Sequence, residues 1–156
     1  MEIRRAVSTD SLLLSSLCMD VQSLHAENHS DVFKTPANEG FAASFFAEML
    51  AEPAVTIFIA EENKEAVGYV FCQLIERPES PFTFAVRSLH IDQISVRPAA
   101  HSQGVGAALI QQAELLAKQL NVQRIQLDSW DFNLNAHAFF ERLGFEKYNF
   151  RFWRKL

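Results

Sequence analysis

The hydrophobic residues of the chain recur in two periods, and each change of period marks the border of a predicted element. Short apolar runs, most with a period of two, predict strands over Glu2–Ala6, Val55–Ala60, Ala66–Leu74, Phe84–Val96, Arg124–Leu127 and Phe145–Trp153. Helical spacing predicts helices over Asp10–Leu24, Phe41–Leu50, Val105–Leu120 and Asn133–Leu143. Polar residues and prolines predict connections over His25–Pro36, Glu61–Lys64 and Arg77–Pro81. Helices therefore alternate with strands that are largely joined by hairpins, which predicts an α/β fold: a mixed sheet with helices on both faces.

Composition and charge place the chain among globular proteins. Its 156 residues fit one domain, 1–156, that is large enough for a hydrophobic core, and 49% of them are hydrophobic, including 14 Phe. The net charge of −5 disfavours a nucleic-acid-binding protein, because the only basic run is Arg151–Lys155. Nucleic acid is therefore not an expected partner.

Cysteine usage and hydropathy predict a cytoplasmic protein. Cys18 and Cys72 lie far apart, without a C-x-x-C pair or a Cys/His metal-binding spacing, which fits two buried thiols in a reducing compartment. No signal peptide is visible, and the apolar run around Leu12–Leu14 is too short to span a bilayer. We therefore expect neither a metal nor a membrane as a partner.

The stretch Gln93–Leu109 carries the clearest functional signal. Its strand ends at Pro98, which has no N–H group for the ladder, and a helix opens at Gly104 and Gly106 after a short polar turn. The first turn of a helix has unpaired N–H groups and the positive end of the helix dipole. Glycine lets a large anion approach the main chain without a Cβ in the way. The stretch therefore predicts a site for a phosphate group.

Two known phosphate-binding motifs do not fit this stretch. A P-loop is excluded because Gly106 is followed by Ala-Ala-Leu, and no Gly-Lys-Ser/Thr occurs anywhere in the chain. The dinucleotide fingerprint requires Gly or Ala where Leu109 stands. The remaining alternative is a strand-to-helix turn that uses its glycines for geometry alone.

The residues flanking the turn favour another interpretation. They read Val96-x-Pro98, then His101-x-x-Gly104-x-Gly106-x-x-Leu109. This pattern resembles the acetyl-CoA loop of the GNAT N-acetyltransferase superfamily, Val-x-Pro followed by Arg/Gln-x-x-Gly-x-Gly/Ala and a helix. His101 stands where the family usually has Arg or Gln. The main-chain amides do most of the pyrophosphate binding in the family, so this departure changes little.

A second motif of the same family follows in the expected order and distance. It reads Asn133-x-x-Ala136-x-x-Phe139-Phe140-x-x-Leu143-Gly144-Phe145. It resembles the family pattern Asn-x-x-Ala-x-x-Phe-Tyr-x-x-Leu-Gly-Phe. In the family the Asn faces the CoA arm, and the Tyr lies near the thioester sulfur as a general acid. Position 140 is Phe here, so that hydroxyl group is absent. From the residues alone, this segment is one apolar helix face ended by Gly144.

The resemblance implies a GNAT acyl-CoA N-acyltransferase fold, with a central, mostly antiparallel sheet flanked by helices, and acetyl-CoA as cosubstrate. It implies an N-acetyltransferase that moves an acetyl group directly to a primary amine through a tetrahedral intermediate. In the family, the strand that carries Ile94 diverges from the next one and binds the pantetheine arm. An N–H group around Ile94 then polarises the thioester carbonyl. The expected cofactor-binding residues are Ile94, Ser95, Val96, His101, Ser102, Gln103, Gly104, Val105, Gly106, Ala107, Asn133, Ala136, Phe139 and Phe140.

The general base is expected on the same strand. His90 and Asp92 precede Ile94 by four and two residues, which places them on one face of a regular strand. Some family members carry proton-accepting residues at those offsets. A polar pair on a strand is otherwise a solvated face or a structural hydrogen bond. Tyr148 or Tyr69 could replace the missing acid, although Tyr69 is more simply a core residue.

The acceptor side is expected after the first helix. His25, Glu27 and His29 lie in the predicted loop where the acceptor commonly enters in the family, and Trp130, with Asp131, borders the acetyl site or packs in the core. A solvated loop explains the first three equally well, and a metal site would need further ligands. The acceptor remains open between a small-molecule amine and a protein or peptide amine.

Two further expectations concern assembly and activity. The aromatic alternation of Phe150 and Phe152 with Arg151 and Trp153 predicts an edge strand of the kind that pairs in homodimers. The missing Tyr also leaves an alternative from another class, a degenerate acyl-CoA-binding module with a sensing or protein-interaction role.

Overall fold

The computed structural model describes all residues, 1–156, and contains one five-stranded sheet with the strands in sequential order. The strands are β1 (Glu2–Arg5), β2 (Val55–Glu62), β3 (Glu65–Arg77), β4 (Val86–Val96) and β5 (Ile125–Leu127). The helices are α1 (Ser11–Asn28), α2 (Ala43–Ala51), α3 (Val105–Gln119) and α4 (Leu134–Arg142), with short 3₁₀ turns at Ser8–Asp10 and Pro98–Ala100. Neighbouring strands are antiparallel except β4 and β5, which are parallel. The predicted mixed sheet, mostly antiparallel, is confirmed.

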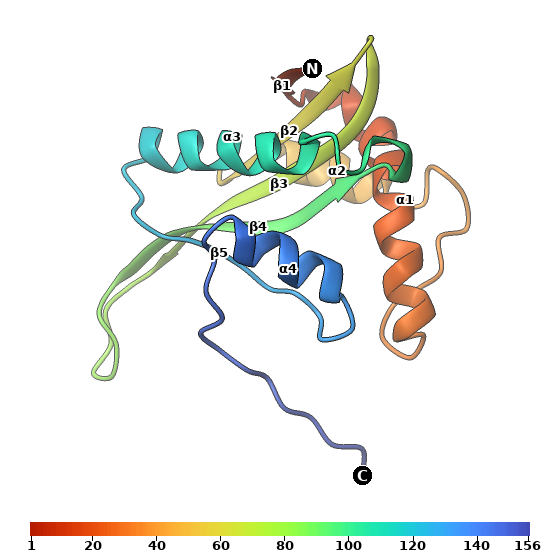
Figure 1. Cartoon of the computed structure of the whole chain (residues 1–156). Coiled ribbons are helices and arrows are strands. Elements are labelled where there is room, and N and C mark those ends of the chain that lie inside the picture. Colours follow the sequence, from red (N-terminus) through yellow and green to blue (C-terminus); the bar gives the residue numbers. More distant parts are fainter.

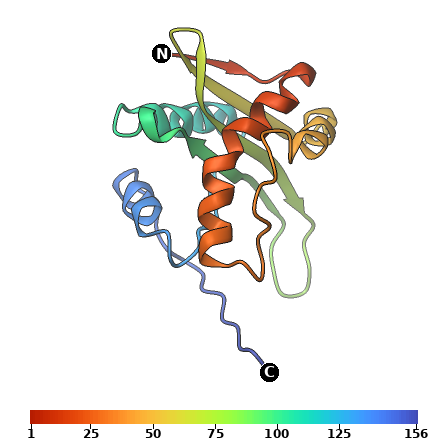
Figure 2. The same cartoon turned by 90° about the vertical axis from the view of Figure 1, so that its right-hand side faces the viewer.

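Helices cover both faces of the sheet, and each face has its own hydrophobic core (Figure 1). One core lies under α3 and α4, and the other lies under α1 and α2. Figure 2 shows α3 and α4 on one side of the strands and α2 on the other. Because both faces are covered, β2 is a nearly continuous apolar run, and its residues Val55–Ala60 are all buried.

The β2–β3 hairpin follows from its turn residues. Glu62 pairs with Glu65, which leaves a two-residue loop, and both loop residues have positive φ: 51° at Asn63 and 68° at Lys64. This is the turn geometry whose twist matches that of paired strands. The hairpin predicted at Glu61–Lys64 is therefore confirmed.

A salt bridge anchors β1 to the start of α1. Arg4 donates two hydrogen bonds to Asp10, at 2.7 and 3.0 Å, and a third to Glu61 at 2.7 Å. The main-chain N–H of Val7 also donates to Asp10, at 2.8 Å. The Arg4 hydrogen bonds hold the pKa of the Asp10 carboxyl group below its usual range. Asp10 thus stabilises the chain reversal into the helix.

Two sequence predictions about elements are wrong. The first helix runs to Asn28 rather than Leu24, so His25 and Glu27 belong to its last turns and not to a loop. The predicted strand Phe145–Trp153 is absent: residues 146–156 have no secondary structure and are exposed. In both views this segment leads away from the sheet (Figures 1 and 2). The alternation in this segment was genuine, but an alternating pattern forms a strand only where a neighbouring strand is available.

The close approach of β3 and β4 gives a first prediction. A Cβ at Gly68 would lie 2.7 Å from the main-chain oxygen of Ser95 and 3.2 Å from Val96. We expect Gly68→Ala to lower the free energy of unfolding by about 1–3 kcal/mol, the usual effect of overpacking. Urea denaturation followed by circular dichroism measures it. Gly40→Ala is the matched control, because its Cβ would meet only 3.4 Å contacts. Equal stability of the two variants would contradict the prediction.

Candidate active site

The candidate site is the gap that opens where β4 and β5 diverge. The two strands pair only between Leu89–Ile91 and Ile125–Leu127. β4 continues beyond this point to Val96, still paired with β3. The β5-facing edge of β4 therefore has no neighbouring strand after its first half, and a ligand can occupy that position.

The main-chain groups along this edge are partly free. The N–H of Arg97 donates to Val67 of β3 at 2.8 Å. Because hydrogen-bonding direction alternates along an antiparallel strand, Ile94 and Val96 turn their N–H and C=O groups away from β3. His101 donates from Nε2 to the Val96 carbonyl at 2.8 Å. The groups of Ile94 stay available, next to the gap.

A β-bulge at Asp92 changes which residues share a face. Phe71 of β3 pairs with Gln93, but the next residue of β3 pairs with Ile91, so Asp92 has no partner. The alternation of side chains reverses at this point. His90 and Ile94 therefore lie on opposite faces, and the prediction of one shared face is wrong. A single extra residue changes the parity of the strand, which the sequence pattern did not reveal.

The contacts on each side of the bulge confirm this reversal. Leu89 and Ile91 pack in the core under α3 before the bulge, and Ile94 and Val96 pack against the same core after it. Ser95 faces α1 instead, where its hydroxyl donates to the carbonyl of Leu17 at 3.1 Å.

A buried polar cluster holds β4 on the α1 face. The fully buried Tyr69 donates to Oε1 of Gln93 at 2.6 Å, and the Cys18 thiol lies 3.8 Å from the same oxygen. Burial raises the pKa of both the Tyr69 phenol and the Cys18 thiol, and it raises the pKa of Cys72 to about 12. Both thiols therefore stay protonated near neutral pH, which makes neither a nucleophile.

Six consecutive main-chain N–H groups at the start of α3, those of residues 102–107, have no hydrogen-bond acceptor within the chain. No side chain caps the helix, whose N-cap residue is Gly104. Such a row of donors, together with the helix dipole, is what a bound phosphate group requires. The arrangement predicted for this turn is present.

The two glycines of this turn serve different purposes. Gly104 has a φ of 83°, which few other residues adopt, and a Cβ there would meet nothing within 4 Å. A Cβ at Gly106 would lie 3.0 Å from the ring of Phe139. Gly106 thus lets α4 pack against the first turn of α3, a purpose that the sequence interpretation did not foresee.

Helix α4 closes the same side of the gap. Asn133 is its N-cap residue, and its side-chain oxygen accepts a hydrogen bond from Ala136 N–H at 3.3 Å. Phe139 packs against α3, whereas Phe140 is buried in the core between Phe139 and Phe145, with ring centroids 5.2 and 5.7 Å apart. Gly144 follows the helix with a φ of 86°, which is the predicted C′ geometry.

The structure separates the three predicted catalytic residues. His90 is partly buried, and its Nε2 lies 4.0 Å from Oδ2 of Asp128, which follows the end of β5 and is 96% exposed. Asp92 is exposed at the bulge. Tyr148 lies in the exposed segment after α4 and is 73% exposed. His90 and Asp128 therefore flank the point where β4 and β5 diverge. Sequence reasoning missed Asp128, whose position after a strand end was the available signal.

Most of the predicted acceptor residues come together in an aromatic cluster. His25 contacts Phe33 and Phe132, with ring centroids 4.8 and 5.6 Å apart, and His29 contacts Trp130 at 5.0 Å. This cluster joins the end of α1 to the β5–α4 connection. His29 also lies 3.8 Å from Asp131, which is almost fully exposed. Glu27, exposed on α1, makes no hydrogen bond to the cluster. Phe33 and Phe132 were not predicted.

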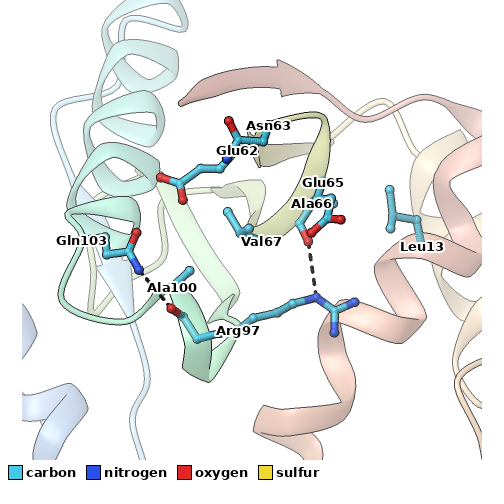
Figure 3. A pocket seen from close by; sticks show the side chains of 10 residues that line it. Leu13, Glu62, Asn63, Glu65, Ala66, Val67, Arg97, Ala100 and Gln103 are labelled. Carbon is cyan, nitrogen blue, oxygen red and sulfur yellow. Dashed lines mark hydrogen bonds between the residues drawn. The ribbon is translucent and has the colours of Figure 1, made fainter.

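A cavity of about 540 Å³ opens between the β2–β3 hairpin and the β4–α3 connection, and it is lined in part by Gln103, one of the expected cofactor-binding residues (Figure 3). Arg97 crosses it, donating to the carbonyl of Ala66 at 3.3 Å and to Ser16 at 3.2 Å. Glu62 and Glu65 line the same cavity, and their carboxylates disfavour a phosphate there. Arg97 therefore attaches the connection to β3 and α1.

No group of three or more His, Cys, Asp or Glu side chains is placed to bind a metal ion. None of the helices combines the length and the hydrophobicity needed to cross a bilayer.

Comparison with known proteins identifies the family. The model of the acetyltransferase (GNAT) family matches residues 20–145. The chain belongs to the GNAT acetyltransferase family. It is therefore an N-acetyltransferase by family, and its sheet, with the gap between β4 and β5, is the GNAT fold.

Relatives and solved structures agree with this assignment. An N-alpha-acetyltransferase of Sulfurisphaera tokodaii is 28% identical over 117 residues, which cover 70% of this chain and 67% of that protein. Across the curated relatives, the matched part spans from 40% to 91% of the relative's length. The BH1408 protein of Bacillus halodurans, crystallised as a tetramutant, has a TM-score of 0.93 and 23% identity over the whole of both chains. The aminoglycoside N-acetyltransferase AAC(6')-Iy, crystallised with CoA, has a TM-score of 0.75 and 18% identity, covering 99% of this chain and 93% of that one.

Proposed function

We propose that this GNAT protein moves an acetyl group from acetyl-CoA to a primary amine by direct attack. The observation that carries the proposal is the row of six free N–H groups at residues 102–107, beside the open edge of β4. These donors fit the pyrophosphate of CoA, and the unpaired main chain around Ile94 fits the amide groups of the pantetheine arm. The CoA complex of the structural neighbour AAC(6')-Iy supports this choice.

The thioester carbonyl needs a donor where negative charge develops during attack. The N–H of Ile94 points into the gap and fits that purpose. The buried, protonated thiols of Cys18 and Cys72 argue against an acetyl-cysteine intermediate, so the amine attacks the thioester itself. Both cysteines are free thiols, which also favours the reducing cytoplasm as the location of the reaction.

The acceptor is a cationic amine in this proposal. The acceptor side combines exposed carboxylates, at Asp128 and Asp131, with the faces of Trp130 and His29. Carboxylates and aromatic rings both attract an ammonium group. The amine then loses its proton to become a nucleophile, and His90, which lies where β4 and β5 diverge with its Nε2 4.0 Å from Asp128, is the base in this proposal.

Removing one donor from the α3 turn tests the cofactor site. Ala107→Pro eliminates the N–H of Ala107, which has no partner in the chain, at a position in the first helical turn where Pro is tolerated. Gly106 precedes it and has no Cβ to clash with the ring. Since a hydrogen bond to a charged group contributes about 1.5–3 kcal/mol, we expect CoA affinity to fall about 10- to 100-fold by calorimetry. Ala107→Ser, which keeps the N–H, is the control. Equal affinity of the two variants would place the pyrophosphate elsewhere.

The general base is tested by a pH profile. An imidazole base loses activity on the acid side as it becomes protonated. We expect His90→Gln to lower kcat/KM by about 10²–10⁴-fold and to remove that acid limb, whereas CoA affinity stays unchanged. Asp128→Asn should lower the rate less, because it acts through His90. If the double variant His90→Gln, Asp92→Asn keeps wild-type activity across pH, neither residue is the base.

Position 140, where the family has Tyr and this chain has Phe, allows a test that distinguishes an enzyme from a binding module. The CoA thiol is a fair leaving group, so we expect measurable thiol release with at least one amine in a panel of polyamines, amino acids, aminoglycosides and peptides. Phe140→Tyr should change kcat by no more than the roughly 10²–10⁴-fold that a well-placed acid gives, and Tyr148→Phe should leave kcat unchanged if water protonates the thiolate. No turnover in the wild type, with turnover restored by Phe140→Tyr, would show that the natural protein binds acyl-CoA without catalysis.

A further inference from the structure

Tyr69 of β3 has a hydroxyl group that neither the core nor the proposed reaction accounts for. It is the largest fully buried side chain, and its ring packs against Phe46 with the ring centroids 5.8 Å apart. A phenylalanine would fill the same space. The hydroxyl group donates to Oε1 of Gln93 at 2.6 Å, which is a short distance for a hydrogen bond between two oxygen atoms. Burying a hydroxyl group is unfavourable unless such a bond is made, so the contact between Tyr69 and Gln93 is a specific one.

Gln93 occupies a critical position on β4. It stands between the bulge at Asp92, which has no partner on β3, and Ile94, whose N–H group points into the gap. A bulge disrupts the ladder locally and bends the strand. Because the planar peptide unit between Gln93 and Ile94 carries the Ile94 N–H, the orientation of Gln93 decides where that N–H points.

Few contacts hold the side chain of Gln93 in place. Its amide nitrogen donates to no other group of the chain, and the Cys18 thiol, 3.8 Å from Oε1, is a weak donor. Burial holds the pKa of the Tyr69 phenol well above its usual value, so Tyr69 stays protonated and donates near neutral pH. Two residues further on, Ser95 donates to the carbonyl of Leu17 at 3.1 Å and holds the strand beyond Ile94. Tyr69 is therefore the main side-chain contact of β4 between the bulge and Ile94.

We infer that Tyr69 is a positioning residue: its hydrogen bond to Gln93 holds the peptide unit after the bulge so that the N–H of Ile94 points at the thioester carbonyl. The inference rests on the proposed function, since it concerns the donor that stabilises the negative charge formed during acyl transfer. Such a donor is effective when it is held in position before the reaction. A misplacement of about 1 Å can lower the rate about 10²-fold, even when it arises far from the chemistry.

Tyr69 does not fit the role of the missing acid. Its side chain is fully buried in the core under α1 and α2 and has no exposed surface from which to pass a proton to CoA. The same hydroxyl group is already the donor in the hydrogen bond to Gln93. Tyr69 thus acts on the reaction through Gln93 and the main chain, and not by touching the substrate.

The substitution Tyr69→Phe removes the hydrogen bond and keeps the ring. We expect kcat with the best amine to fall about 10- to 100-fold, whereas the Kd of CoA by calorimetry stays within about twofold, because CoA has no thioester carbonyl. Ser15→Ala is the matched control: Ser15 is also fully buried, and its hydroxyl oxygen accepts from the N–H of Ala42 at 3.0 Å, without a hydrogen bond to β4. Ser15→Ala should leave kcat unchanged, and circular dichroism should show both variants folded.

A double-mutant cycle tests whether Tyr69 acts through Gln93. We expect Gln93→Leu to lower kcat at least as much as Tyr69→Phe does, and the double variant to be no slower than Gln93→Leu alone. Effects of the two substitutions that multiply independently overturn the inference. A Tyr69→Phe variant with the kcat of Ser15→Ala, or with a loss of CoA affinity as large as its loss of kcat, also overturns it. These outcomes leave the proposed function intact, whereas a wild type that binds CoA but acetylates no amine overturns both.

Discussion

The structure depends on one constraint: β4 is paired along its whole length on one side and along only three residues on the other. A main-chain N–H or C=O group needs a hydrogen-bond partner when water is excluded. β3 satisfies one edge of β4 throughout, and β5 satisfies the other edge only as far as Ile91. The part of β4 after Ile91 therefore has one edge that is held by β3 and one edge that is free. A ligand with amide groups can therefore bind as if it were the missing strand.

The two cores allow that edge to stay open without loss of order. The core under α1 and α2 fixes β4 from one face through the hydrogen bond between Tyr69 and Gln93. The core under α3 and α4 fixes the other face, and Phe139 resting on Gly106 keeps the start of α3 beside the gap. Neither core requires β5 to pair with β4 beyond Ile91. The donors of the α3 turn and the edge of β4 are consequently preorganised before any ligand arrives, which lowers the entropic cost of binding.

Local signals were strong enough to predict most of the fold and the glycine turn before α3. Gly144 was predicted correctly as the C′ residue of α4, because glycine is the residue that most readily adopts a positive φ, whereas the positive φ of Gly104 was not predicted. Asn133 was placed correctly at a helix start for a similar reason. The faces to which the side chains of β4 point were not predicted correctly, because a β-bulge adds a residue without any change in composition.

Features that depend on residues distant in the sequence could not be predicted. The proximity of His90 to Asp128 arises from the parallel pairing of β4 with β5 across an intervening helix. The end of α1 was placed too early, because His25 and Glu27 interrupt its apolar pattern while still fitting a helix. Residues 146–156 have the alternating pattern of a strand, but the pattern alone does not show whether a neighbouring strand is present.

The bulge at Asp92 separates the path of the main chain from the faces of the side chains. Cys72 pairs with Ile91 and Phe71 pairs with Gln93, so Asp92 is the extra residue of β4. Without Asp92, Ile91 would be joined directly to Gln93, and Ile94 and Val96 would still face the core under α3, as in a regular ladder. The extra residue therefore leaves the core unchanged: it bends the strand and exposes one polar side chain at the bend.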